Sequence, residues 1–289
     1  PLKRSDDLCG AITPAAAALT GLTAGTPVGG GMFDIDAAAV ATGVTDPSQL
    51  NVIVGTWSNN QYISPEPVAS PDLFMTSVFC VPGYWLVLEG SATSASNLEW
   101  FVSEFLAAER QQANRQGQSV WDLCNELVAA TKASDSQIVF LPFVWGSNVN
   151  PNAQGALVGL QGWHQRGHVL RAVYEGVAFS HRTHMENLLR FRERPESIRI
   201  SGGAARSRVW MQIFADVFQI PIEVPASSEL GALGAAMCAG IASGVYQDFC
   251  QAVGTFAKVR YVCVPDPAKA AIYENKFKLY QKLNNLLDD

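Results

Sequence analysis

Long uninterrupted hydrophobic runs are missing from this 289-residue chain, although 48% of its residues are hydrophobic. Every window of about 18 residues contains a charged or polar break, so we expect no transmembrane helix and no membrane partner. A basic segment followed by an apolar one is also missing near the N-terminus, so we expect no signal peptide and a cytoplasmic location. The chain begins with Pro1 instead of Met, which is typical of a start inside a longer protein.

An excess of positive charge is also missing. Lysine and arginine number 20 against 26 acidic residues, which gives a net charge of −6 and a pI near 5.3. Nucleic-acid binding needs a basic surface, so we expect no nucleic-acid partner. None of the six cysteines lies in a C-x-x-C pair. Their wide spacing and apolar surroundings predict free thiols in a reducing compartment and not a disulfide framework.

Strands alternate with helices along the chain, which predicts an α/β fold. The expected strands are a short buried one within 26–34 and those at 51–57, 85–89, 138–142, 197–203 and 220–224. The expected helices are 15–19, 36–43, one from residue 96, one around 121–128, and those at 171–194, 209–218, 230–243 and 267–287. The small residues of 230–243 predict close packing of that helix. The length suits one large domain or two modest ones.

Four glycine-bearing turns each follow an expected strand, at Gly29–Gly31, Gly55-Thr56, Gly90-Ser91 and Gly202-Gly203. A turn from a strand into a helix presents backbone N–H groups, which suits a phosphate. None of these turns carries the G-x-G-x-x-G pattern of a dinucleotide site or the G-x-x-x-x-G-K-[ST] pattern of a P-loop, so neither is supported. The sequence favours a nucleotide site of another type.

Two carboxylates and two histidines are candidates for chemistry. Asp34 stands at the end of the expected Gly-rich strand, where a carboxylate is costly to bury unless it has a function. Asp36 precedes three alanines and is expected to be a helix N-cap. His181 and His184 are one helical turn apart, but too few further ligands lie nearby for zinc, so we expect no metal site there.

Five groups of residues, in fixed order and spacing, carry a family resemblance over roughly residues 10–250. The most specific is Gly155-x-Leu157-x-Gly159-Leu160, seven residues, and then His168-Val169-x-x-Ala172-Val173-Tyr174-Glu175. The other four are Thr20-Gly21-Leu22-x-x-Gly25-Thr26-Pro27-Val28 with Asp34; Gly55-Thr56; Leu88-Glu89-Gly90 with Asn97-Leu98-Glu99-Trp100; and Gly202-Gly203-Ala204-x-x-Ser207-x-x-Trp210-x-Gln212-x-x-Ala215-Asp216 with Glu229 and 233–236. Together they resemble the FGGY carbohydrate kinases, which phosphorylate sugars and polyols with ATP.

Within this family, the residues of several motifs are similar to those of the L-xylulose kinase branch. The resemblance implies an actin-like, ribonuclease-H-like fold with two domains. This chain looks like the C-terminal portion only: residues 1–45 as the tail of the N-terminal domain and 46–289 as the C-terminal, nucleotide-binding domain. The first phosphate loop of the family has no counterpart in the chain, so we expect the chain alone to be inactive.

The resemblance also implies site residues. Asp34 maps to the family's general base, and Gly55 and Thr56 map to its second phosphate loop. Gly202, Gly203 and Ala204 map to the adenosine loop, Ser207 is expected beside the adenine, and Asn97 and Glu99 belong to a helix start near the adenine or ribose. Glu175 and Asp216 are expected to be capping or interior hydrogen-bond partners.

The implied reaction is ATP-dependent phosphorylation of a sugar hydroxyl, with a pentulose such as L-xylulose or D-xylulose as the small-molecule substrate. The cofactors are ATP and Mg²⁺, the latter held largely by phosphates, waters and a carboxylate outside this chain. A homodimer is plausible in this family. Two alternatives stay open: a non-catalytic actin-like nucleotide-binding module, and a kinase for a polyol or aldonate such as glycerol, erythritol or gluconate.

Overall fold

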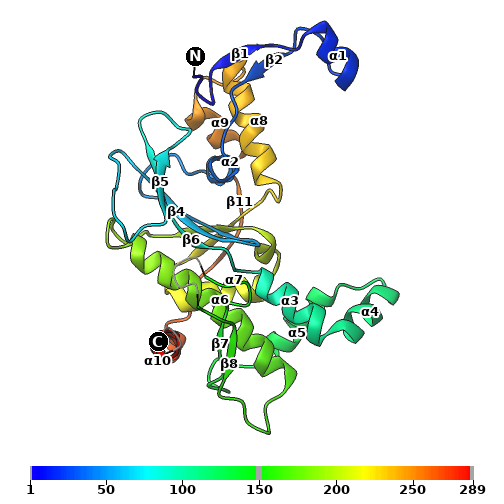
Figure 1. Ribbon diagram of the computed structural model, residues 1–289, viewed down its shortest axis with the longest axis vertical. Helices are drawn as coiled ribbons and strands as arrows, with labels where there is room; N and C mark the ends of the chain where they lie inside the picture. Colours follow the sequence, from blue (N-terminus) through cyan, green and yellow to red (C-terminus); the bar gives the residue numbers. More distant parts are fainter. Residues whose placement is uncertain (1, 148–151, 287–289) are drawn as a thin grey trace. The chain divides into compact units, whose positions relative to one another are not determined.

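The computed structural model of the chain describes residues 2–147 and 152–286 and has a mixed α/β architecture (Figure 1). The strands are β1 (Leu8–Ala11), β2 (Pro27–Gly29), β3 (Leu50–Val54), β4 (Ser58–Ser64), β5 (Met75–Val78), β6 (Trp85–Ser91), β7 (Val139–Leu141), β8 (Ala156–Val158), β9 (Ile198–Ser201), β10 (Ile222–Pro225) and β11 (Val259–Cys263). Seven of them form one sheet in the order β11-β10-β9-β3-β4-β6-β5. In this sheet β9 and β10 run parallel, as expected for strands joined through a helix.

The α-helices are α1 (Pro14–Thr20), α2 (Asp34–Ala41), α3 (Ser96–Phe105), α4 (Ala107–Arg115), α5 (Val120–Ala129), α6 (Arg166–Leu188), α7 (Arg208–Phe218), α8 (Leu230–Ala242), α9 (Phe249–Phe256) and α10 (Ala270–Leu286). Short 3-10 helices span Gly203–Arg206 and Pro267–Lys269. All eight expected helices are therefore present. The long helix begins at Arg166 instead of residue 171, because Gln165 and His168 form a capping box at its start. It ends at Leu188 instead of residue 194.

The chain divides into two compact units. Unit 1 comprises residues 1–51, 61–87 and 225–261, and unit 2 comprises 52–60, 88–224 and 262–289. This division does not test the domain boundary predicted at residue 45, which stays a prediction.

Helices α2 and α8 lie against each other in unit 1 (Figure 1). A Cβ atom added to Gly234 of α8 would lie 2.0 Å from the carbonyl oxygen of Ala37 in α2, so a side chain there would clash with backbone. The close packing expected from the small residues of this helix is therefore confirmed, and glycine is required at this contact.

The N-terminal hairpin of unit 1 departs from the expectation. Strand β2 pairs with β1 in antiparallel fashion, and most of its residues are exposed, so the buried strand expected within 26–34 is wrong. Asp34 is not at a strand end; it is the exposed first residue of α2, where its Oδ1 accepts the backbone N–H of Ile35 at 2.9 Å. A carboxylate in the first turn of a helix is favoured by the helix dipole.

The glycine turn predicted at Gly90 and Ser91 is also wrong. Gly90 does not form a turn, because it lies inside β6. A Cβ atom there would be 2.0 Å from the carbonyl oxygen of Ser58, so this glycine permits close backbone approach between neighbouring strands β6 and β4.

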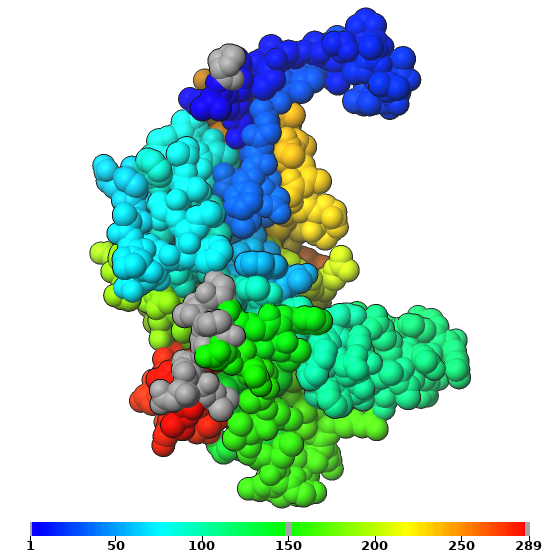
Figure 2. All heavy atoms as spheres, in the orientation of Figure 1, coloured from blue at the N-terminus to red at the C-terminus, as the bar shows by residue number. Residues whose placement is uncertain are grey.

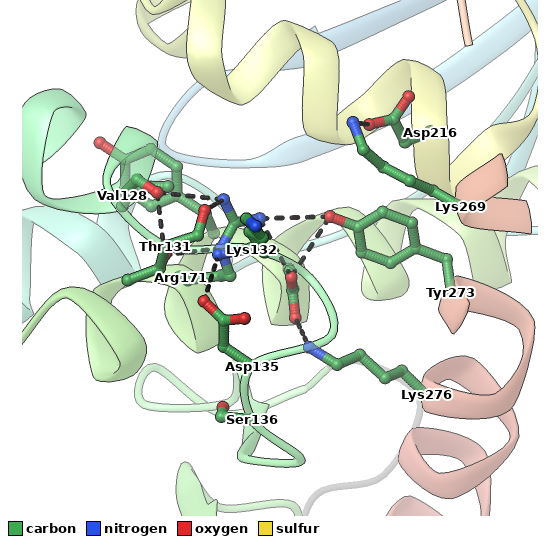
Figure 3. Close-up of polar contacts among 12 residues, drawn as sticks. Val128, Thr131, Lys132, Asp135, Ser136, Arg171, Asp216, Lys269, Tyr273 and Lys276 are labelled. Carbon is green, nitrogen blue, oxygen red and sulfur yellow. Dashed lines mark hydrogen bonds and ion pairs between the residues drawn. The ribbon is translucent and has the colours of Figure 1, made fainter. Parts of the chain in front are cut away.

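Helix α6 forms the centre of unit 2, where it contacts α3, α5, α7, α10 and β7. Helices α3, α4 and α5 form a projecting group of this unit, seen in teal and green in Figure 2. A buried ionic cluster joins α6 to α5 and α10 (Figure 3). Lys276 donates to Glu175 Oε2 at 2.7 Å, and each residue is 1% exposed.

Arg171 and Tyr273 complete this cluster. The Arg171 guanidinium donates to the carbonyl oxygens of Val128 and Thr131, at 3.0 and 2.7 Å, where α5 ends (Figure 3). The Tyr273 hydroxyl donates to Glu175 Oε1 at 3.3 Å. Glu175 is thus an interior hydrogen-bond partner, as expected. Asp216 is likewise buried and pairs with Lys269 at 2.9 Å.

Several predicted absences can be examined over residues 2–147 and 152–286. No helix in these ranges is long and apolar enough to cross a membrane. The same residues contain no group of three or more histidine, cysteine or acidic side chains that could hold a metal ion. All six cysteines are free, as expected; four are buried, while Cys9 and Cys250 are exposed.

Asp36 is not the expected N-cap. It is the third residue of α2, whose N-cap is Phe33, and it is only 5% exposed. Its Oδ2 accepts the backbone N–H of Cys80 at 3.1 Å, while Oδ1 has no partner among the described residues. Burial, opposed by this hydrogen bond and assisted by the nearby Asp34 carboxylate, raises the pKa of Asp36 to about 7. At a pH between the ordinary value of 3.8 and about 7, Asp36 is therefore protonated in the folded chain and ionised in the unfolded chain.

This buried carboxyl predicts a pH-dependent stability. Because the pKa of Asp36 is raised on folding, its stabilising protonated form is present at low pH and is lost as the pH rises towards 7. Raising the pH from 5 to 8 should lower the free energy of unfolding by about 2–3 kcal/mol through this one group. Asp36→Asn should remove that component, as measured by urea unfolding at both pH values. The exposed Asp34→Asn serves as the control and should retain most of the pH dependence; an unchanged dependence in Asp36→Asn would contradict the assignment.

Candidate functional site

A cavity of about 910 Å³ lies in unit 2. Its walls come from the turn after β3, the helices α3 and α5, and the segment that leads into α7. The lining residues are Gly55, Thr56, Ala95, Ser96, Leu98, Glu99, Trp100, Ser103, Glu104, Ser119, Trp121, Asp122, Asn125, Trp145, Tyr174, Gly203, Ala204, Arg206, Ser207 and Trp210. The volume falls within the range of ordinary small-molecule sites, and aromatic rings mixed with a few polar groups are typical of such sites.

The turn at Gly55 and Thr56 is fastened to the start of α3. The carbonyl oxygen of Gly55 accepts the N–H of Ala95 at 2.9 Å, and that of Thr56 accepts the Ser96 hydroxyl at 3.1 Å. The Thr56 side chain is exposed, and its hydroxyl has no partner among the described residues. This wall therefore presents a hydroxyl beside a helix N-terminus, a combination that suits an anionic group.

His181 supports this wall from the interior of unit 2. Its Nε2 lies 2.8 Å from Ser94 Oγ, just before α3, and its Nδ1 lies 2.9 Å from Asn60 Oδ1 in β4. His181 is fully buried, and burial lowers its pKa, so the ring is neutral at physiological pH. A neutral ring can donate through Nδ1 and accept through Nε2, which satisfies both neighbours.

The second histidine of this helix is also interior. His184 Nδ1 lies 3.1 Å from Glu89 Oε2, and both side chains are buried. The two histidines thus contact separate partners in the core of unit 2.

The two glycines after β9 have different functions in the structure. Gly202 has φ of +93°, and a Cβ atom on it would be 2.5 Å from the carbonyl oxygen of Val54, so any side chain would clash with β3. Gly203 is exposed, lines the cavity and has nothing within 4 Å of its would-be Cβ. Gly202 brings β9 close to β3, and Gly203 leaves free space above the backbone.

Ser207 lies at the end of the segment that begins with Gly203 and leads into α7. It is the N-cap of α7, and its hydroxyl oxygen accepts the backbone N–H of Trp210 at 3.1 Å. The same hydroxyl donates to Asn125 Oδ1 at 2.6 Å. Tyr174 also donates to Asn125 Oδ1, at 3.1 Å, and its ring stacks on Trp210 with centroids 4.4 Å apart. Helices α5, α6 and α7 thus meet in one hydrogen-bonded group on the cavity wall.

The charges on the cavity wall are mostly negative. Glu99, Glu104 and Asp122 come from α3 and α5, and Arg206 is the one cation among the lining residues. Glu99 pairs with Arg110 at 3.1 Å. Because Arg110 compensates the charge of Glu99, an anionic group of a ligand would be favoured away from Glu104 and Asp122.

The structure brings most of the expected binding residues together. Those that line the cavity are Gly55, Thr56, Glu99, Gly203, Ala204 and Ser207. Asn97 does not line it: this side chain is fully buried, and its amide donates to Thr93 and Ser94. Gly202 is also not a lining residue. Asp34 belongs to unit 1.

Sequence reasoning missed Asn125, Tyr174 and Trp121 as cavity residues. Residues 121–128 predicted a helix from its apolar positions, and Asn125 lies between them without any motif of its own. Tyr174 was noted only as part of a family pattern. The one signal in the sequence was that Asn125 is a polar residue within the otherwise amphipathic pattern of α5.

The chain is similar to known carbohydrate kinases. The sequence profile described as "FGGY family of carbohydrate kinases, C-terminal domain" matches residues 50–243. The L-xylulose/3-keto-L-gulonate kinase of Escherichia coli K12 is 37% identical over 289 residues, which cover 98% of this chain and 55% of that protein. This chain therefore spans about half the length of that relative.

Solved structures give the same result. Xylulose kinase from Rhodospirillum rubrum superimposes with a TM-score of 0.85 at 33% identity, covering 99% of this chain and 57% of that one. Gluconate kinase from Lactobacillus acidophilus gives a TM-score of 0.85 at 25% identity, covering 99% and 56%. These neighbours have the actin-like ATPase fold, as the resemblance implied. The profile covers well over half of the chain, and the chain therefore belongs to the FGGY family of carbohydrate kinases, whose C-terminal domain it contains.

Proposed function

We propose that the unit 2 cavity binds ATP and that the protein containing this chain transfers the γ-phosphoryl group to a sugar hydroxyl. The observation that supports this most directly is the meeting of two distant segments, Gly55-Thr56 and Gly203–Ser207, on one cavity. Family membership makes the same reaction class the natural expectation.

The side chains on the cavity wall indicate at which end the phosphates and at which end the base of the nucleotide would bind. We place the phosphates beside the Thr56 hydroxyl, near the start of α3, because this hydroxyl is exposed and has no partner among the described residues. The base belongs at the other end, among the aromatic rings and beside Ser207 and Asn125. Glu104 and Asp122 would repel phosphates from the outer parts of α3 and α5. The open space above Gly203 lets a nucleotide lie against the backbone.

In the proposed reaction, the sugar hydroxyl oxygen forms a bond to the γ-phosphorus, and the bond from that phosphorus to the β–γ bridging oxygen breaks to release ADP. Asp34 accepts the hydroxyl proton. Its exposed position at the start of α2 leaves the carboxylate accessible. Mg²⁺ would be bound by the nucleotide phosphates and by groups outside this chain, since the described residues provide no cluster of three or more acidic, histidine or cysteine ligands.

The proposed substrate is a pentulose such as L-xylulose or D-xylulose. The names of the relatives support this choice, since the Escherichia coli protein is an L-xylulose/3-keto-L-gulonate kinase and the Rhodospirillum rubrum protein a xylulose kinase. The gluconate kinase among the structural neighbours keeps an aldonate as the alternative.

Nucleotide binding can be tested at Gly203. Gly203→Val should fold normally, because nothing lies within 4 Å of the added Cβ, but the side chain would fill the space above the backbone. The Kd for ADP should rise at least about tenfold, the loss expected from removing a favourable contact and adding a steric one. Quenching of tryptophan fluorescence would report binding, because Trp100, Trp121, Trp145 and Trp210 line the cavity.

Gly162→Val is the matched control. Gly162 also has nothing within 4 Å of its would-be Cβ, lies in unit 2 and is not a cavity residue. It should bind ADP as the unsubstituted chain does. Equal ADP affinity in Gly203→Val and Gly162→Val would exclude the proposed position of the nucleotide.

The proton acceptor can be tested by Asp34→Asn in a protein that carries this chain together with the N-terminal half present in its relatives. Loss of a general base should lower kcat by about two to four decades while the Kd for ADP stays nearly constant. Asp36→Asn is the comparison and should retain turnover, because Asp36 is buried in unit 1. The opposite result, an essential Asp36 and a dispensable Asp34, would reassign the base.

A further inference from the structure

Asn125 lies on the cavity wall where the helices α5, α6 and α7 meet. It projects from α5, is half-buried and lines the cavity beside Tyr174 and Ser207. Among the described residues, both hydrogen bonds of its side chain are made by one atom, Oδ1, which accepts from Ser207 at 2.6 Å and from Tyr174 at 3.1 Å. The side chain is thus fixed by contacts from α6 and from the start of α7.

The chemistry of the two hydroxyl groups determines which end of the amide faces them. The Ser207 oxygen already accepts the backbone N–H of Trp210 at 3.1 Å, so its own hydrogen needs an acceptor. Burial raises the pKa of Tyr174, so its hydroxyl keeps its proton at neutral pH and also needs an acceptor. An amide turned the other way would present two N–H donors to these groups and leave both hydroxyl hydrogens without a partner. Oδ1 must therefore face Ser207 and Tyr174.

This orientation leaves the Nδ2 amide group as a free donor. Within residues 2–147 and 152–286, no group accepts a hydrogen bond from Asn125 Nδ2. The carboxylates of Glu104 and Asp122 on the same wall are acceptors, so Asn125 contributes the opposite kind of group. A fixed donor without a partner, on the wall of a mostly apolar cavity, is suited to forming a hydrogen bond with an acceptor atom of a ligand.

We infer that Asn125 is a specificity-determining residue whose Nδ2 donates a hydrogen bond to a ring nitrogen of the purine base. The inference rests on the proposed nucleotide function. A purine has acceptor nitrogens at positions 1, 3 and 7 in adenine, and Ser207, which holds Asn125, lies at the end of the cavity assigned to the base. The Ser207 and Tyr174 hydroxyl groups act through Asn125 by fixing its orientation.

The test combines single-atom analogues of ADP with a near-isosteric variant. Binding of ADP and of its 1-deaza, 3-deaza and 7-deaza analogues to the 289-residue chain is measured by tryptophan fluorescence. Each analogue lacks one acceptor nitrogen. One of the three should bind about three- to tenfold more weakly than ADP, the effect of losing one neutral hydrogen bond.

Asn125→Asp is the variant to compare. A carboxylate of nearly the same shape still accepts from Ser207 and Tyr174 but can no longer donate, so ADP should bind more weakly and the penalty of the sensitive analogue should disappear. Asn114→Asp is the matched control. It adds the same charge at an exposed position of α4 outside the cavity, and it should preserve both the affinity and the analogue penalty.

The outcomes are distinguishable. If the chain binds ADP but no deaza analogue is weakened, or if the penalty persists in Asn125→Asp, the inference about Asn125 is overturned while the nucleotide site stands. If the unsubstituted chain does not bind ADP, the proposed function is overturned and the inference falls with it. Thermal unfolding of each variant establishes that the chain is folded before binding is compared.

Discussion

The buried pair of Glu175 and Lys276 is the interaction on which the architecture of unit 2 depends. Both residues are 1% exposed, and Lys276 Nζ lies 2.7 Å from Glu175 Oε2, while Arg171 and Tyr273 both donate to the other oxygen, Oε1 (Figure 3). Removing one member of such a pair leaves an uncompensated buried charge, which typically costs about 3–5 kcal/mol. The cluster fixes α6 against α10 and the end of α5. Since α5 carries Asn125 and α6 carries Tyr174, the same cluster holds two walls of the cavity in register.

Close backbone contacts provide the second constraint. Gly202 approaches Val54, and Gly90 approaches Ser58, in both cases so closely that any side chain would clash with a carbonyl oxygen. These contacts hold the ends of β9, β3, β4 and β6 together, which brings the Gly55-Thr56 turn and the Gly203 segment to one cavity. Gly202 and Gly90 therefore permit close contacts between strands, whereas Gly203 leaves room for a ligand.

Much of this arrangement could be predicted from sequence, for identifiable reasons. The helices around 121–128 and 209–218 have apolar residues at helical spacing, and Gly203 and Ser207 occur in a pattern of fixed spacing. Strand β4 was missed because three of its five buried residues are polar. Asn60 and Gln61 are 0% exposed, and their side-chain amide nitrogens donate hydrogen bonds whose acceptors only the folded chain brings into reach. The N-cap expected at Asp36 was wrong, because the burial of Asp36 and the exposure of Asp34 depend on how α2 packs in unit 1. The role of Asn125 could not be predicted from sequence either, since the orientation of its side chain depends on the hydroxyl groups of Ser207 and Tyr174.

Photoaffinity labelling with 8-azido-ADP tests the central claim most directly, because it locates the base without relying on a substitution. The account predicts a label that excess ADP prevents and that maps by peptide mass spectrometry to the cavity-lining parts of α3 and α5 or to residues 203–210. Labelling confined to residues 225–261 of unit 1, or labelling that ADP does not prevent, would contradict it.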